Sequence, residues 1–396
     1  MFRVVHFLFG VVLWLGKVTA GSDDVVASNV SISVDTNVAA LVDWLRSRGG
    51  IFNEKMEIRK VNPDDEESVL GIFAKEDIKA TELLLHIPTN CLITAGPPVV
   101  GDRVLVNHEA PGTWKSGVVD LVETESGNEI YSVVYDDGEK RSTVSSDALH
   151  KDMEGGIVCD AIHNLIKEVK LGEESEYAPF VAFLLEQKID QPLSTWSQAG
   201  KNLLNGILQN DLPPLWATQW SLSKKCVKSG NPLEAQAAMI QLLRGWGDVL
   251  VPLYDIMRHR NGQYLNTVHD KIMWSKSVVV RASRDIIAGE EIHTSYNFCS
   301  DCAGKEGDYG TGEILRDYGF IEPLPQLWFF PKYDIAFSLE ELPEGGFKVK
   351  WNGGEPQAEG ITYMEGQLWR LKDIVAKDLK SPDPNLPRNE LTTISW

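Results

Sequence analysis

Four short segments carry the residue types that could do chemistry, and they follow one another in a fixed order along the chain. Between them they supply tyrosine hydroxyls, an imidazole and a guanidinium, groups that bind and orient a reactant through hydrogen bonds. The segments are Leu70-Gly71-Ile72-Phe73-Ala74; Glu168, Gly172, Ser175, Tyr177 and Pro179-Phe180; Leu250 through Asp255 to Arg258-His259; and Ala288-Gly289-Glu290-Glu291-Ile292, followed by Ser295-Tyr296 and then Tyr318-Gly319-Phe320.

The common catalytic signatures are absent from the sequence. It contains no G-x-S-x-G elbow, no P-loop, no G-x-G-x-x-G and no H-E-x-x-H, which argues against the usual hydrolases, nucleotide-binding enzymes and zinc proteases. Cys299 and Cys302 form a single C-x-x-C, whereas a structural zinc site needs four ligands, so we expect no metal site. Three interpretations of this pair remain: a local disulfide that stabilises a loop, two unreactive thiols, or a redox-active dithiol.

Taken together and in this order, the four segments resemble those of the SET-domain protein methyltransferases. The similarity is greatest to the Rubisco large-subunit methyltransferase-like group, whose SET domain is split by a helical insert. It covers roughly residues 38–323, apart from a segment at 97–150. The resemblance implies S-adenosylmethionine as the cofactor and a protein lysine, or sometimes a histidine, as the methyl acceptor.

The resemblance also implies roles for individual residues. Tyr296 matches the catalytic tyrosine, which orients the acceptor amine beside the methyl group, and Tyr318 and Phe320 match residues that wall the channel or the cofactor pocket. Gly71 matches a glycine at which the backbone approaches the cofactor closely, with Ile72 and Phe73 after it. Methyl transfer is an in-line displacement, so positioning of the two reactants supplies most of the catalysis.

The sequence departs from the family pattern at two positions. His259 matches the histidine of the family's Asn-His pair, but the asparagine is replaced by Arg258, and a glycine that usually precedes Gly71 by two residues is Val69. Arg258 can bind the cofactor's carboxylate, yet its permanent charge opposes the cofactor's ammonium and sulfonium. A catalytically degenerate SET protein that acts as a binding module is therefore the alternative function.

The sequence patterns around these residues predict the elements that position them. Together they indicate an α+β fold with a split SET domain. Apolar spacing predicts a helix from Val38 that ends at Gly49-Gly50, and strands at 56–61, 70–74 and 83–88. Helical patterns follow between about 155 and 248, with one apolar face at Ala161, Ile162, Leu165, Ile166 and Val169 and another from Ala235 to Leu243. Strands return at 278–280 and 291–296. We place the SET domain at 38–96 and 151–323, and a folded C-terminal region at 324–396.

Residues 97–150 predict a small β-barrel inserted into the N-terminal half. Strand patterns at 101–106, 114–119 and 131–139, the last ending in an Asp-Gly hairpin turn, resemble a Tudor-like domain. Such domains can hold a methylated lysine in an aromatic cage. The candidate cage residues are Trp114, Tyr131 and Tyr135, with Asp137 as the counter-charge. Lys115 stands at a position where the group often has an aromatic residue. The alternative is a barrel that only packs against the SET domain or shapes the substrate groove.

The N-terminus and the overall charge bear on compartment and partners. Arg3, the apolar run 4–15 and Val18-Thr19-Ala20 predict a secretory signal peptide over 1–20, followed by a flexible entry over 21–37 that holds a glycosylation triplet at Asn29. The alternative is a signal that leads to another organelle. Once the signal is removed, we expect no membrane span. A net charge of −19 disfavours nucleic acid and favours a protein substrate whose lysine lies in a basic segment.

Overall fold

The computed structural model describes most of the chain beyond its N-terminus. The described residues are 31–65, 68–107, 114–125, 128–151, 159–187, 193–208, 226–227, 230–246, 249–269, 277–297, 309–330, 335–374, 383–387 and 390. The predicted signal peptide, Asn29, Cys299 and Cys302 lie outside this part of the chain. No helix within it is both long and apolar enough to cross a membrane.

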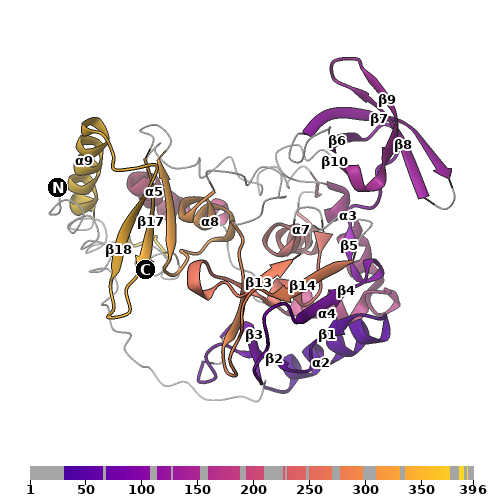
Figure 1. The fold of residues 1–396 in the computed structure, drawn as a ribbon, viewed down its shortest axis with the longest axis horizontal. Coiled ribbons are helices and arrows are strands. Elements are labelled where there is room, and N and C mark those ends of the chain that lie inside the picture. Colours follow the sequence, from indigo (N-terminus) through magenta and orange to yellow (C-terminus); the bar gives the residue numbers. More distant parts are fainter. Residues whose placement is uncertain are drawn as a thin grey trace.

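Two four-stranded sheets and a strand pair form the centre of the molecule (Figure 1). The first sheet has the order β1-β4-β14-β13 and the second the order β12-β15-β3-β2, while β11 pairs with β5. In the second sheet β12 runs parallel to β15, and β3 lies antiparallel to β15. The strands are Ile51–Phe52 (β1), Met56–Lys60 (β2), Leu70–Ala74 (β3), Leu83–Ile87 (β4), Ile93–Thr94 (β5), Val249–Leu250 (β11), Arg258–His259 (β12), Thr267–His269 (β13), Val278–Ala282 (β14) and Glu291–Thr294 (β15).

Helices cover this centre, and their apolar faces agree with the sequence pattern. Helix α2 (Ser31–Ser47) begins seven residues before the predicted start at Val38, so residues 31–37 of the segment predicted to be flexible are helical. It buries Leu41 and Leu45 and is followed by Gly49, whose φ of +83° suits glycine. Helix α3 (Cys159–Leu171) buries four of the five predicted residues of its apolar face, and the fifth, Val169, is half-buried against the same core. The remaining helices of this region are α4 (Ala178–Glu186), α5 (Gln198–Leu208) and α7 (Pro232–Arg244), and they agree with the predicted helical stretch.

One disulfide joins two parts of the helical region. Cys159, the first residue of α3, is bonded to Cys226, which precedes α7, and the two are 67 residues apart in sequence. The imidazole of His163, one turn into α3, also contacts the carbonyl oxygen of Cys226 at 2.6 Å. This pair cannot be predicted from the sequence, because cysteines so far apart give no local pattern.

The insert is a five-stranded antiparallel sheet with the order β10-β6-β7-β8-β9. Among the described residues no pairing joins the two edge strands β10 and β9, so the closed barrel predicted from the sequence is not shown. Gly138 forms the predicted hairpin turn between β8 and β9, with a φ of +85°. The strands are Arg103–Asn107 (β6), Trp114–Glu125 (β7), Asn128–Tyr135 (β8), Lys140–Ser145 (β9) and Leu149–Lys151 (β10).

The C-terminal region is a three-stranded sheet with one helix packed on it. Strands β16 (Gln326–Phe330), β17 (Ile335–Glu341) and β18 (Phe347–Asn352) pair in sequence order, and α9 (Ala358–Ile374) contributes Met364 to their apolar core. Helix α8 (Thr311–Tyr318) connects the central strands to this sheet. Figure 1 shows the insert and the C-terminal sheet at opposite ends of the molecule, with the central strands between them.

Candidate active site

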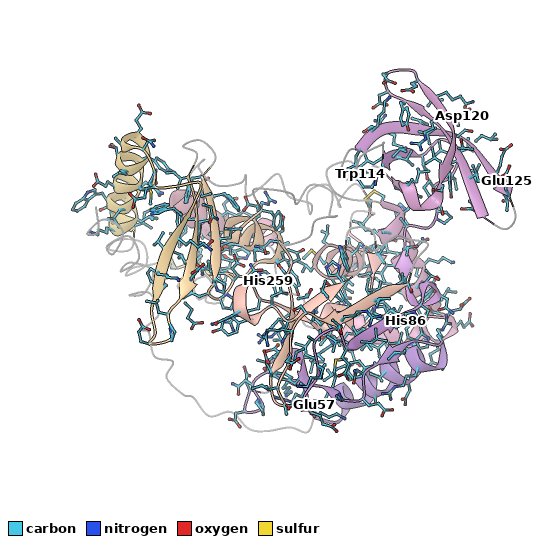
Figure 2. The ribbon with its side chains drawn as sticks, in the orientation of Figure 1. Glu57, His86, Trp114, Asp120, Glu125 and His259 are labelled. Atoms are coloured by element: carbon cyan, nitrogen blue, oxygen red, sulfur yellow. A yellow bond between two sulfur atoms is a disulfide. The ribbon has the colours of Figure 1, made fainter. Side chains whose placement is uncertain are left out.

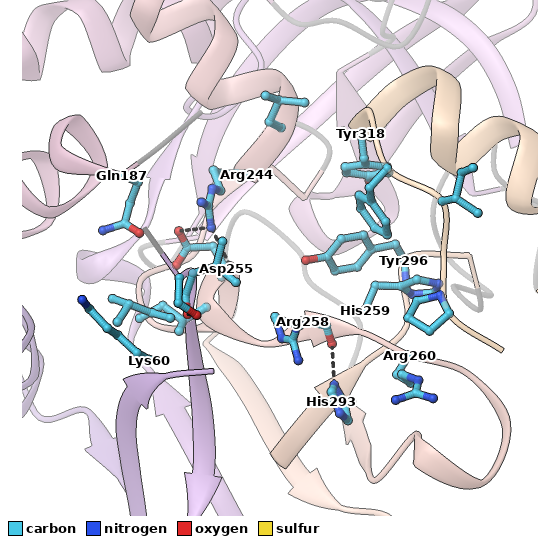
Figure 3. Close-up of a pocket in the computed structure, with 18 of the residues that line it drawn as sticks. Lys60, Gln187, Arg244, Asp255, Arg258, His259, Arg260, His293, Tyr296 and Tyr318 are labelled. Atoms are coloured by element: carbon cyan, nitrogen blue, oxygen red, sulfur yellow. Dashed lines mark hydrogen bonds and ion pairs between the residues drawn. The ribbon is translucent and has the colours of Figure 1, made fainter. Parts of the chain in front are cut away.

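A large cavity of about 530 Å³ opens between the central strands, the helical region and α8. Figure 3 shows Tyr296, Tyr318 and His259 on one side of it and Arg244, Asp255, Gln187 and Lys60 on the other. Its lining combines aromatic and charged side chains: Lys60, Ser68, Val69, Leu70, Glu186, Gln187, Leu243, Arg244, Asp255, Ile256, Arg258, His259, Arg260, His293, Tyr296, Tyr318, Phe320, Ile321 and Pro323. Five of the residues proposed from sequence are thus brought together: Arg258, His259, Tyr296, Tyr318 and Phe320.

Parallel strand pairing positions the histidine beside the tyrosine. Arg258 lies opposite His293 and His259 opposite Thr294, and Tyr296 follows just beyond the end of β15. The backbone N–H of Tyr296 donates a hydrogen bond of 3.0 Å to Nδ1 of His259. Segments that are more than 30 residues apart in sequence are therefore fixed to each other by backbone pairing and one side-chain contact.

A left-handed glycine brings two further aromatic rings to Tyr296. Helix α8 ends at Gly319, whose φ of +80° is the left-handed conformation typical of helix C-termini. This turn lets Tyr318 and Phe320 both face Tyr296, with ring centroids 4.9 Å and 6.4 Å from it. His259 completes the cluster, its ring centroid 5.1 Å from that of Tyr296.

The hydroxyl of Tyr296 stays protonated at neutral pH. Burial raises the pKa of this hydroxyl well above its ordinary value, because the phenolate would lose its hydration. The hydroxyl donates its hydrogen to the carbonyl oxygen of Met257 at 3.3 Å. Its oxygen lone pairs are consequently available to accept a hydrogen bond from a ligand.

A second, small cavity of about 60 Å³ adjoins the large one. Tyr296, Tyr318, Arg244, Leu243 and Asp255 line both cavities, so these side chains separate the two spaces. The remaining wall of the small cavity includes a group of rings: Trp246 stacks on Tyr254 at 5.0 Å and meets His269 edge-on at 4.2 Å. An aromatic wall of this kind attracts a cation.

Arg258 is held by a carboxylate. Its Nε and Nη2 each donate a hydrogen bond of 2.6 Å to Glu291, in the two-pronged geometry that suits guanidinium and carboxylate. Among the described residues no partner takes the hydrogens of its Nη1. The positive charge that the sequence analysis regarded as unfavourable is therefore compensated within the protein, and one nitrogen remains available for a ligand.

Asp255 is a buried carboxylate whose oxygens have no hydrogen-bond partner among the described residues. Arg244 is its nearest cation, at 4.0 Å. Burial raises the pKa of Asp255 to about 6, since Arg244 at this distance offsets only part of the lost hydration. The carboxylate gives the boundary between the two cavities a negative charge at neutral pH.

Three predicted cofactor-binding residues do not reach the large cavity. Gly71, Ile72 and Phe73 are buried in β3, between β15 and β2, and the cavity is lined instead by Val69 and Leu70. The space that a side chain at Gly71 would need is filled by Glu291, 2.7 Å from the ideal Cβ position. The group that closely approaches the backbone at Gly71 is therefore the side chain of Glu291, where the sequence had predicted the cofactor.

The lining includes functional candidates that the sequence analysis missed. Asp255 stood within a quoted segment but was given no role, and Arg244 ends a helix predicted only as an apolar face. An ionisable residue at the end of a buried apolar segment was the available signal for both. Lys60, Gln187, Arg260 and His293 carry no local signal, because tertiary packing alone brings them to the cavity.

The four proposed cage residues do not form an open cage. The rings of Tyr131 and Tyr135 are buried in the core of the insert sheet. The ammonium of Lys115 lies 4.2 Å from the ring centroid of Tyr135 and 2.8 Å from Asp137, so the protein's own cation takes the place proposed for a methylated lysine. Trp114 is half-buried, and Figure 2 shows it far from His259, a residue that lines the large cavity.

In the described part of the chain, no cluster of side chains could hold a metal ion.

One family model and several solved structures match the chain. No curated protein matches the sequence. Among solved structures, the chain is similar to the SET domain of LSMT bound to lysine and AdoHcy (15% identity, TM-score 0.43, 87% of this chain and 75% of that one) and to Rubisco LSMT bound to sinefungin and monomethyllysine (16% identity, TM-score 0.42, 81% and 68%). The model of the SET domain family matches residues 69–297, more than half of the chain. The chain therefore belongs to the SET domain family.

Proposed function

We propose that this chain is an S-adenosylmethionine-dependent protein-lysine N-methyltransferase. The observation that carries the proposal is the place of Tyr296, whose side chain lines both the large and the small cavity. A transfer reaction between two bound molecules needs such a boundary, where the donor and the acceptor meet. Membership of the SET domain family supports the same reaction.

The large cavity suits the cofactor in size and charge. Its volume of about 530 Å³ falls within the range of small-molecule sites. Arg258 would bind the carboxylate of S-adenosylmethionine through its open Nη1, and the negative charge of Asp255 would favour the cationic end of the molecule. When bound, S-adenosylmethionine supplies the methyl group.

The small cavity suits the side chain of the acceptor lysine. The rings of Trp246 and Tyr254 would contact its alkyl chain and favour its cationic form on entry. Lysine must lose a proton before it can attack, and a desolvated cavity lowers its pKa in that direction. The hydroxyl of Tyr296 would then accept a hydrogen bond from the neutral amine, leaving the nitrogen lone pair free to point into the large cavity.

Charge and covalent structure support two further parts of the proposal. A net charge of −19 favours a substrate lysine within a basic segment. The disulfide between Cys159 and Cys226 favours an oxidising compartment, which supports the secretory pathway predicted from the N-terminus. Delivery by the same signal to another organelle is the alternative.

Calorimetric titration of S-adenosylmethionine into the full-length protein, together with transfer of its labelled methyl group to basic peptides, tests the proposal. We expect saturable one-to-one binding and labelled lysine. Tyr296→Phe should lower methyl transfer about 100-fold or more, with cofactor affinity within about threefold of the wild type. The control is Tyr363→Phe in α9, the helix packed on the C-terminal sheet, which should change neither quantity.

Two results would contradict the proposal. Undiminished transfer by Tyr296→Phe would remove the role of this tyrosine. A folded protein that fails to bind the cofactor at millimolar concentration would instead support the binding module, the alternative that the replacement of asparagine by Arg258 suggested.

A further inference from the structure

Glu322 is a buried carboxylate that lies outside the segment matched by the family model, yet it contacts side chains inside that segment. Only 1% of its side chain is exposed. One oxygen accepts hydrogen bonds from Nε2 of His259 at 2.6 Å and from Nδ2 of Asn261 at 3.1 Å. The other accepts from the hydroxyl of Thr311 and, at 3.4 Å, from the backbone N–H of Leu327. Four donors thus offset the cost of burying this charge.

His259 transmits the position of Glu322 to Tyr296. Its Nδ1 accepts the backbone N–H of Tyr296, so in the neutral ring the proton must be on Nε2, the nitrogen that faces Glu322. A carboxylate in this place selects one tautomer of the imidazole and fixes the plane of its ring. The backbone of Tyr296 is therefore oriented by a carboxylate that does not itself line the large cavity.

Asn261 forms a second connection, to the residues on either side of Tyr296. Its Nδ2 donates to Oδ1 of Asn297 at 3.0 Å as well as to Glu322. Its Oδ1 accepts the hydroxyl of Ser295 at 2.8 Å. Through His259 and Asn261 together, Glu322 is tied to three consecutive residues, with Tyr296 in the middle.

The other side of Glu322 is attached to elements beyond the matched segment. Thr311 is the first residue of α8, the helix that ends at Tyr318, and Leu327 lies in β16 of the C-terminal sheet. Nε2 of Gln326, in the same strand, donates to the backbone carbonyl of Glu322 at 2.8 Å. The C-terminal sheet and the aromatic wall of the cavity are thus joined to Tyr296 through one side chain.

We propose that Glu322 is a positioning residue for Tyr296, acting through His259 and Asn261, and that the C-terminal sheet is thereby an integral part of the active site. This inference rests on the proposed methyl transfer at Tyr296. A displacement of about 1 Å at a reacting centre can cost about 100-fold in rate, so loss of this orientation should lower turnover without removing the cofactor's own contacts.

The test compares Glu322→Gln with Glu390→Gln in the full chain. Glu390 is a matched control because it is a second buried carboxylate, which accepts two hydrogen bonds of 2.7 Å from Ser197. In Glu322→Gln an amide NH₂ replaces one of the two carboxylate oxygens. This NH₂ cannot accept the hydrogen bonds that the wild-type oxygen accepts. We expect kcat to fall about 100-fold with cofactor affinity unchanged, and in the Tyr296→Phe background we expect no additional fall. Glu390→Gln should keep its kcat.

A nitrogen NMR spectrum of His259 gives a readout that needs no activity. In the wild type we expect a single neutral tautomer with the proton on Nε2, and in Glu322→Gln a mixture of tautomers. If Glu322→Gln does not fold, Thr311→Val removes a single donor and should lower kcat about tenfold. Additive effects of Glu322→Gln and Tyr296→Phe, or an unchanged tautomer with full kcat, would overturn the inference. Absence of methyl transfer in the wild type would overturn the proposed function instead, and the spectrum would still test the connection.

Discussion

Arg258 shows how much the effect of one residue depends on its neighbours. By itself, an arginine in place of the usual asparagine would repel the ammonium and sulfonium of the cofactor. In the fold, Nε and Nη2 of Arg258 each donate a hydrogen bond of 2.6 Å to the carboxylate of Glu291, so the ion pair of Arg258 and Glu291 has no net charge. The side chain of Glu291 is 12% exposed and fills the space beside Gly71, which ties this compensation to the glycine as well.

A double-mutant cycle on this pair measures the compensation. Glu291→Gln leaves the guanidinium charge unpaired, and we expect it to weaken S-adenosylmethionine binding about tenfold, which equals about 1.4 kcal/mol. Adding Arg258→Asn to Glu291→Gln removes the unpaired charge and also the proposed Nη1 contact with the cofactor's carboxylate, so the double variant should regain only part of the lost affinity. The measurement is calorimetric titration of all four proteins. Equal affinity of Glu291→Gln and the wild type would contradict this account.

Asp255 should make stability depend on pH in the direction opposite to that of most carboxylates. Its pKa is raised by burial from 3.8 to about 6, so the folded state holds the proton more tightly than the unfolded state. Stability should therefore fall as pH rises from about 4 to about 6, with a total effect of about 3 kcal/mol. Asp255→Asn should remove this slope and be the more stable protein at pH 7.5, as measured by urea unfolding at several pH values.

The control for this experiment is Asp285, an exposed carboxylate with the opposite shift. A hydrogen bond from the backbone N–H of Ala80, followed by its contact with Lys79, lowers the pKa of Asp285. Its contribution is present at neutral pH and is lost as pH falls through its lowered pKa, so Asp285→Asn should not flatten the slope assigned to Asp255. A pH-independent difference between Asp255→Asn and the wild type would refute the assignment.

At the scale of elements, short pieces of structure bring the site together. Strand β12 has two residues, yet its parallel pairing with β15 sets His259 beside Tyr296. Helix α8 has two functions, since its first residue binds Glu322 and its C-terminal turn presents Tyr318 and Phe320. The insert sheet, in contrast, buries its tyrosines in its own core, and its aromatic residues take no part in the cavity.

Gly319 is a residue at which substitution should disturb the end of a helix and the cavity together. Its φ of +80° is strained for any residue with a Cβ, so Gly319→Ala should cost about 1 kcal/mol and also weaken cofactor binding by displacing Tyr318 and Phe320. Gly366 in α9 is the matched control, because a Cβ there meets no atom within 4 Å and alanine favours the helix. Urea unfolding and cofactor titration should show opposite signs for the two stability changes. A Gly319→Ala protein as stable as the wild type would contradict the argument.

At the scale of the whole molecule, one covalent bond spans much of the helical region. In the chain-entropy picture, closing a loop between residues 67 positions apart stabilises the folded state by about 4 kcal/mol. The doubly substituted protein Cys159→Ser/Cys226→Ser should lose about this much in urea unfolding. Dithiothreitol should lower the wild type to the same level and leave the variant unchanged. A further effect of dithiothreitol on the variant would assign the stabilisation to other cysteines.

The sequence by itself determined many of the local elements and several of the residues that line the large cavity. Apolar spacing gave the buried faces of α2 and α3, and the Asp-Gly pair gave the turn at Gly138, because these features depend on neighbours within a few residues. The ordered segments placed Arg258, His259, Tyr296, Tyr318 and Phe320 at one site, and all five line the cavity. Such motifs are readable because each keeps its functional residue next to the strand or turn that presents it.

Only the tertiary structure decided which distant groups meet. The compensation of Arg258 by Glu291, the bond between Cys159 and Cys226 and the role of Glu322 each join segments separated by more than 30 residues, and no periodicity records such contacts. The same reason explains the misplaced residues: a strand pattern at 70–74 does not say that Gly71 faces Glu291, and strand patterns at 101–139 do not say whether the sheet closes. Packing between elements settles these points, because it alone determines which side chains share a buried space.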